Sequence, residues 1–144
     1  MTARMLLAIL LMALLNLGCS ATTSLTAAQG GTALSVKESH STAAPRTEEY
    51  SATSFGNYEF KAASPGFDPL YGVLPLKFNG GYLALDILFF APAMFFNLRE
   101  VYPYYEFDMD KRVVRYKKHP SDPWVNYQPS EAESQRAKGH FAGK

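Results

Sequence analysis

The aromatic residues of this chain are distributed unevenly, and this is the strongest constraint on how the chain folds. Nineteen of the 20 aromatic side chains lie in residues 55–144, and Tyr50 is the other one. Aromatic side chains bury large apolar areas and dominate the energetics of small cores. A segment of 90 residues with this density can build one core, although domains of that size are only marginally stable. The sequence therefore predicts one compact domain over residues 55–144.

The preceding segment, from Ser20 to Ser54, has the opposite composition. Ser, Thr, Ala and Gly make up 23 of its 35 residues, and Leu25, Leu34 and Val36 are its only large aliphatic residues. Such a composition offers little apolar surface to offset the entropy that is lost when a chain becomes ordered. We expect residues 19–54 to form a disordered tether with an r.m.s. length of about 30–35 Å.

The clearest strand signal in the aromatic part is a hairpin formed by Pro103–Asp108 and Lys111–Lys118. Side chains alternate along both segments, so one face is mostly apolar and the other mostly charged, as in a sheet with one side in solvent. A two-residue turn at 109–110 would pair Tyr105 with Val114. A three-residue turn would shift the register by one.

Shorter signals complete the predicted domain. Asn57–Lys61 is typical of a strand with alternating aromatic residues, and Tyr71–Phe78 of an extended segment that an internal proline interrupts. Ser130 and Glu133 have the spacing of a capping box, which predicts a short C-terminal helix over Glu131–Lys138.

The most apolar part of the chain after the N-terminus is Tyr82–Leu98, which has 17 residues with Asp86 as the only charge. A helix that is apolar on all sides is buried in a core or in a membrane. This one would be about 25 Å long, against about 30 Å of bilayer hydrocarbon. Asp86 and Pro92 also disfavour a spanning helix. We expect a central helix packed against the hairpin, with a membrane-dipping element and a transmembrane span as the alternatives.

These elements place the chain in the α+β class. The expected architecture is a small single domain in which an antiparallel sheet packs on one central apolar helix. A short C-terminal helix follows, and the disordered tether precedes the domain.

The N-terminus has the features of an export signal. Arg4 provides a positive charge, and Met5–Leu15 is an apolar run of 11 residues, within the about 7–15 of a signal peptide and too short to span a bilayer. Gly18 and Cys19 follow, and Cys19 is the only cysteine. An ordinary secretory signal would leave Cys19 as a free thiol, which is unexpected in an oxidising compartment.

In this region, residues 1 to 20, the chain resembles bacterial envelope lipoproteins. Gly18 and Cys19 match the lipobox of that class, whereas Asn16 stands where leucine is usual. The resemblance implies that residues 1–18 are removed and that Cys19 carries the lipid. Because Ser20, not aspartate, follows the cysteine, the resemblance also implies an anchor in the outer membrane. We expect the anchored protein to face the periplasm.

Two further candidate sites follow from charge. Asp86, in its apolar surroundings, is either a functional carboxylate with a raised pKa or a structural one paired with a tyrosine hydroxyl, a backbone amide or a partner such as Arg99. A basic strip provides a possible contact with an anionic surface, or a merely solvated face that nearby acidic residues neutralise. The strip comprises Lys111, Arg112, Arg115, Lys117 and Lys118.

The function that the sequence favours is non-enzymatic. Residues 55–144 hold 11 basic and ten acidic residues, so no strongly basic face for nucleic acid is expected. We find no catalytic constellation, metal-ligand spacing or cofactor motif in the sequence. The expectation is a lipid-anchored structural or protein-interaction role in the envelope. The alternative is a binding module for anionic lipid, lipopolysaccharide or peptidoglycan.

Overall fold

The computed structural model describes residues 20–37, 41–51, 55–81, 84, 88 and 98–143. Eleven strands and one named helix lie within these residues. They are β1 (Ser20–Ala27), β2 (Ala33–Val36), β3 (Thr42–Ala43), β4 (Arg46–Ser51), β5 (Glu59–Ala63), β6 (Leu70–Val73), β7 (Leu76–Phe78), β8 (Arg99–Val101), β9 (Tyr104–Asp108), β10 (Val113–Lys117), β11 (Val125–Tyr127) and α3 (Glu131–Ala142).

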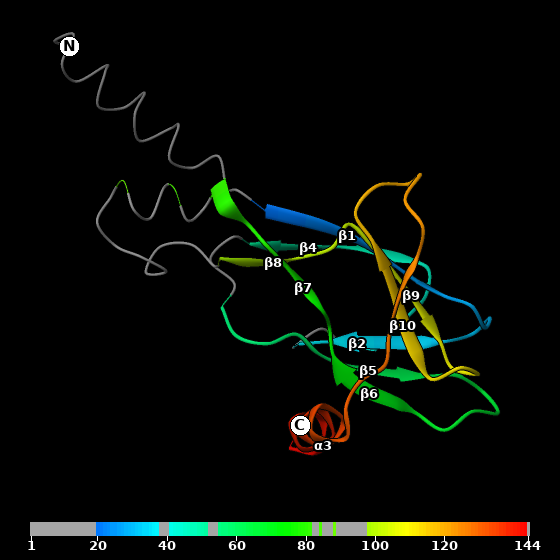
Figure 1. Cartoon of the computed structure of the whole chain (residues 1–144). Helices are drawn as coiled ribbons and strands as arrows, with labels where there is room; N and C mark the ends of the chain where they lie inside the picture. The colour runs from blue at the N-terminus through cyan, green and yellow to red at the C-terminus, as the bar shows by residue number, and fades with distance from the viewer. Residues whose placement is uncertain are drawn as a thin grey trace, which may run out of the picture.

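The strands form two main sheets that face each other (Figure 1). The five-stranded sheet has the order β11-β10-β9-β1-β4, and the four-stranded sheet has the order β3-β2-β5-β6. A third, two-stranded sheet pairs β7 with β8. Helix α3 packs on β5 and β6, on the side of the four-stranded sheet that faces away from the core. The domain is thus mostly β, with one C-terminal helix, which agrees with the α+β class in outline.

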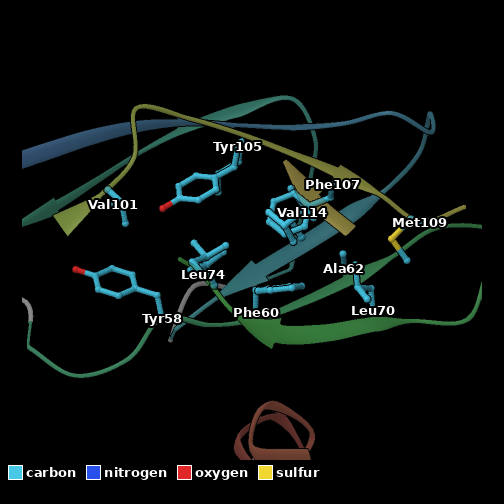
Figure 2. Close-up of a cluster of buried hydrophobic side chains, with 13 residues drawn as sticks. Tyr58, Phe60, Ala62, Leu70, Leu74, Val101, Tyr105, Phe107, Met109 and Val114 are labelled. Carbon is cyan, nitrogen blue, oxygen red and sulfur yellow. The ribbon is translucent and has the colours of Figure 1, made fainter. Parts of the chain in front are cut away.

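The core lies between the two main sheets, and strands contribute most of it (Figure 2). Phe60 of the four-stranded sheet meets Phe107 of the five-stranded sheet edge to face, with ring centroids 5.1 Å apart. Both side chains are fully buried, as are Leu25 and Val114. Aromatic pairs of this geometry stabilise a fold beyond the area that they bury.

The expectation of a disordered tether before the domain is wrong for residues 20–37 and 41–51. Strand β1 lies inside the five-stranded sheet, parallel to β9 and antiparallel to β4. Leu25, Leu34 and Val36 are all fully buried. Three large aliphatics suffice here because each alternates with small or β-branched residues and points inward. The pairing with β9 and β5 supplies the rest of the buried surface.

The expected central helix over Tyr82–Leu98 falls almost wholly outside the described residues, which include only Ala84, Leu88 and Leu98 of that segment. Within the described part of the chain, the two main sheets pack on each other. Helix α3 is the only helix there whose bounds are defined. The core seen here is therefore sheet on sheet, where the sequence favoured helix on sheet.

The hairpin of β9 and β10 is confirmed, but its register differs from the expected one. Tyr105 pairs with Tyr116 in place of Val114, because the loop has four residues in place of two. The Asp108 carboxylate accepts a hydrogen bond from the Lys111 N–H at 3.1 Å, and Arg112 adopts a left-handed φ of 52°. A shift of two residues keeps each side chain on its face of the sheet, so the expected inward-facing residues remain inward.

The capping box of the C-terminal helix is confirmed, and the helix runs to Ala142. The Ser130 side chain accepts from the Glu133 N–H, and the Glu133 carboxylate accepts from the Ser130 N–H at 2.8 Å. Ala137 is fully buried against the sheet. Ser134 donates to the Tyr71 carbonyl at 3.0 Å, which fixes the helix on β6.

Different loops and strand ends lie at the two ends of the sandwich. One end, called the turn end below, gathers the loops at 28–32, 64–67 and 109–112. Gln29 and Asp108 are joined there by a hydrogen bond of 3.3 Å. The other end, called the Ser20 end, holds the first residue of β1, the last residue of β4 (its partner Ser51) and the β7–β8 pair.

Gly72 has the closest neighbours of the described glycines, because a Cβ there would lie 2.7 Å from Pro129 and 2.8 Å from the Phe60 ring. Gly72→Ala is therefore expected to destabilise the fold by about 1–3 kcal/mol, as overpacking does. Thermal unfolding measures the loss. Gly30→Ala, whose Cβ would meet nothing within 4 Å, is the control and should leave the melting temperature nearly unchanged. Equal melting of the two variants would contradict this packing.

Candidate functional site

The outward face of the five-stranded sheet carries a group of aromatic and basic side chains where β10 ends. We call Tyr104, Arg115, Lys117 and Trp124 the aromatic–basic cluster. Register places them together: Lys117 is opposite Tyr104 in the β9–β10 ladder, and Trp124 directly precedes β11, whose Val125 is opposite Tyr116. The Trp124 side chain remains 36% exposed.

Cation–π contacts and hydrogen bonds fix the two basic groups of this cluster. The Lys117 ammonium lies 4.6 Å from the Trp124 ring centroid and 5.6 Å from that of Tyr104, and it donates to the Pro120 carbonyl at 2.6 Å. The Arg115 guanidinium lies 5.9 Å from the Trp124 centroid and forms an ion pair with Glu106. Exposed cation–π contacts are worth about 0.5–1 kcal/mol each. The cluster is thus a preorganised aromatic surface with partly compensated positive charge.

A cleft of about 330 Å³ adjoins the cluster at the end of β10. It is lined by Tyr102, Tyr116, Lys117, Lys118, Asp122 and Val125, with Pro123 at its edge. The rings of Tyr102 and Tyr116 lie 4.4 Å apart. Burial, and then the proximity of Tyr116, raises the pKa of the Tyr102 hydroxyl above its usual value. The Tyr102 hydroxyl is therefore a neutral hydrogen-bonding group at physiological pH.

The basic strip that the sequence suggested is divided between the hairpin loop before β10 and the second half of β10. Arg115, Lys117 and Lys118 lie at the cluster and its cleft. Lys111 and Arg112 lie in the hairpin loop at the turn end, where the Lys111 ammonium is 3.6 Å from Asp108. Five residues close in sequence do not form one contact surface, because the strand carries the two groups to opposite ends of β10.

Arg112 instead lines a larger cavity of about 690 Å³ beside α3. Its walls include Asp68, Tyr71, Glu131 and Lys138. Two basic and two acidic side chains balance the charge of this cavity, so it has no preference for an anion or a cation. Its chemistry does not favour one class of ligand.

The two site residues that the sequence weighed most heavily, Cys19 and Asp86, lie outside the described residues. For Cys19, the structure shows that the next residue, Ser20, is the first residue of strand β1. Among the described residues, buried carboxylates occur at Glu59 and Asp108. Glu59 is paired with the Arg136 guanidinium at 3.0 Å.

Asp108 has the more elaborate environment. Burial raises its pKa, but hydrogen bonds from the Lys111 N–H and the Gln29 amide, together with the Lys111 charge, outweigh burial and lower the pKa below its usual value. Gln29 also accepts from the Met109 N–H at 2.9 Å. Asp108 therefore ties the hairpin loop to the end of β1.

This environment predicts a pH dependence of stability. Because the folded-state pKa is lowered, the ionised carboxylate stabilises the fold above the unfolded-state pKa, and this contribution is lost as the pH falls through the folded-state pKa. Asp108→Asn is expected to cost about 1–3 kcal/mol at neutral pH and progressively less in acid. Urea unfolding at several pH values measures this. A destabilisation of the variant that stays constant down to the lowest pH would contradict the assignment.

The described residues offer little support for other kinds of site. Among them, no three His, Cys, Asp or Glu side chains lie close enough to hold a metal ion. The Asp122 carboxylate accepts from the backbone N–H of His119 at 2.9 Å, which closes a turn. No helix within the described part of the chain is long and apolar enough to cross a membrane.

Sequence reasoning missed two residues that the structure brings to attention, Tyr102 and Phe78. It did not identify Tyr102 as a wall of the cleft, because the irregular backbone at Tyr102 and Pro103 separates it from the strand pattern. It also did not identify Phe78, which is 62% exposed at the end of β7. An alternating strand with a phenylalanine next to Asn79-Gly80-Gly81 was the available signal.

Comparison with known proteins identifies no relative. No family model matches the chain, and neither a curated protein nor a solved structure matches it.

Proposed function

We propose that this chain is a lipid-anchored protein of the bacterial cell envelope with a non-enzymatic, structural or protein-interaction role. In this proposal Cys19 carries the lipid, the anchor is in the outer membrane, and the domain faces the periplasm. The resemblance of residues 1–20 to lipoproteins supports the location. No cofactor and no nucleic acid take part.

The observation that carries the interaction role is the exposed Trp124 held between two cations. The indole is 36% exposed, although tryptophan is usually buried to a large extent. Lys117 and Arg115 keep the ring in place, so little entropy is lost when a partner covers it. Tryptophan, tyrosine and arginine are the residues that most often dominate the binding energy of protein interfaces.

Crosslinking with mass spectrometry of the intact lipoprotein in its own envelope tests this role. We expect one envelope protein to crosslink next to Trp124, and Trp124→Ala to weaken that crosslink strongly. Phe67→Ala, which removes an exposed ring at the turn end, is the matched control and should leave the crosslink intact. An unchanged crosslink in the Trp124 variant would contradict the proposed interface.

The cleft beside the cluster favours a second candidate, a binding module for anionic lipid, lipopolysaccharide or peptidoglycan. Lys117 and Lys118 contribute positive charge there, and Tyr102 and Tyr116 contribute flat apolar walls with polar hydroxyls. The lipoprotein in neutral vesicles should then bind added lipopolysaccharide, and salt should weaken this binding. Lys118→Glu should reduce the binding. Binding that is insensitive to both salt and this variant would exclude an electrostatic role for the cleft.

A further inference from the structure

We propose that the Ser20 end of the sandwich rests on the lipid bilayer, with the Phe78 side chain in the membrane interface. The partner is the interfacial region of a phospholipid membrane. The inference rests on the proposed lipid at Cys19 and goes beyond it, because a lipid alone would leave the orientation of the domain free.

The first step is that no flexible linker separates the anchored residue, Cys19, from strand β1. Strand β1 begins at Ser20, one residue after Cys19, and pairs with β4 from its first residue through the Ser20–Ser51 pair. A chain advances at most about 3.6 Å per residue. A lipid on Cys19 therefore holds the Ser20 end within a few ångströms of the bilayer surface.

The second step is that β7 ends and β8 begins at the level where β1 begins. Tyr104 of β9 pairs with Ser24 of the parallel strand β1. Arg99 precedes Tyr104 by five residues, and Ser20 precedes Ser24 by four. Only two residues separate β8 from β9, and β8 contacts β1. Arg99 therefore lies near the level of Ser20, and so does its ladder partner Phe78. Figure 1 shows the ends of β7 and β8 and the start of β1 on one side of the molecule.

The third step is the chemistry of this tip. Phe78 is 62% exposed, the highest fraction among the described large hydrophobic residues in the strands. Its partner Arg99 is exposed as well. Lys77 and Glu100, the adjacent pair, neutralise each other at 2.8 Å. Phenylalanine beside a basic residue suits the boundary between headgroups and acyl chains, where the ring enters the apolar side and the cation meets the headgroups.

The fourth step is the sequence that departs from this tip. The Asn79 N–H donates to the Leu98 carbonyl at 2.8 Å, so residues 79 and 98 are adjacent. Between them lies the most apolar sequence of the chain after the signal segment, with Asp86 as its only charge. Leu88, one of its two described internal residues, is 68% exposed. The two residues that flank this apolar sequence, Asn79 and Leu98, therefore lie next to Phe78 and Arg99 at the same tip.

Site-specific depth measurement on the full lipidated chain tests the orientation. Acylation consumes the Cys19 thiol, and the sequence has no other cysteine. Phe78→Cys and Phe67→Cys thus each introduce a single free thiol for a fluorescent label. Phe67 is the matched control, since it is an exposed phenylalanine at the turn end, about 25 Å away along the eight residues of β1. Both variants should melt like the original chain.

Each variant is reconstituted into vesicles of phosphatidylethanolamine and phosphatidylglycerol that contain nitroxide-labelled lipid. We expect loss of fluorescence and a blue shift for the label at 78, and neither for the label at 67. Equal emission of the two labels, with the acyl mass present on Cys19, would overturn the orientation while leaving the anchor in place. If the acyl mass is missing from Cys19, the anchor fails first, and the orientation is overturned with it through this separate readout.

Discussion

Phe60→Ala is expected to lower the free energy of unfolding by about 3–5 kcal/mol, the range for phenylalanine replaced by alanine in a core. Phe60 is fully buried, contacts Phe107 of the facing sheet edge to face, and covers Gly72 of the neighbouring strand. Its removal leaves a cavity between both sheets and also exposes the backbone of β6. Equilibrium urea unfolding, followed by circular dichroism, measures the change.

Phe67→Ala is the control for this variant. Phe67 is 39% exposed at the turn end, so its loss should change stability by about 0.5 kcal/mol or less. If the two variants unfolded at the same urea concentration, the aromatic contact between the sheets would not be a major source of stability.

Leu25→Ala is expected to cost about 2–5 kcal/mol. Leu25 is fully buried and stands on β1, between β9 and β4. This loss decides whether residues 20–51 belong to the folded domain, since a leucine in a disordered tether would contribute nothing to its stability. The same urea unfolding experiment gives the answer.

Thr22→Ala is the matched control on the same strand. Thr22 is exposed on the outward face of β1, so its replacement should have little effect. If the Leu25 variant were as stable as the Thr22 variant, residues 20–51 would form the disordered tether that composition alone suggested.

The sequence predicted the β9–β10 hairpin and the C-terminal helix, because the signals for these two elements are local. The alternation around Tyr105 and Phe107 gave the β9–β10 hairpin and its inward face, and Ser130 with Glu133 gave the start of α3. The hairpin register was missed because a four-residue loop depends on Asp108 accepting a hydrogen bond from Lys111, which composition does not reveal.

The first half of the fold could not be predicted in the same way, because its stability comes from partners distant in sequence. Strand β1 pairs with β9, about 80 residues later, as the partners Leu25 and Tyr105 illustrate. A low average content of apolar residues suggested disorder, whereas the position of each apolar residue decides burial. Leu25, Leu34 and Val36 all face the core.

The candidate site was predicted in part. The sequence identified Lys117 as part of a basic strip, and the structure places its ammonium over the rings of Tyr104 and Trp124. It did not foresee that Lys111 and Arg112 would lie at the opposite end of the strand from Lys117. That separation follows from strand length, since each residue of β10 advances about 3.3 Å.

Because strand β1, and not a disordered tether, follows Cys19, an anchor at Cys19 would hold the domain much closer to the membrane. With about 35 residues of slack, the domain could meet partners well away from the membrane. With β1 starting at Ser20, a lipid on Cys19 would confine the domain to the membrane surface. The aromatic–basic cluster would then begin about four residues along the sheet from that surface.

The most direct test of the central claim is the mass of the N-terminal peptide from the membrane-derived protein. Trypsin cleaves after Lys37, so the account predicts a peptide of residues 19–37 that carries acyl chains on Cys19. A peptide with an unmodified Cys19 thiol, or one that begins elsewhere, would contradict the lipid anchor.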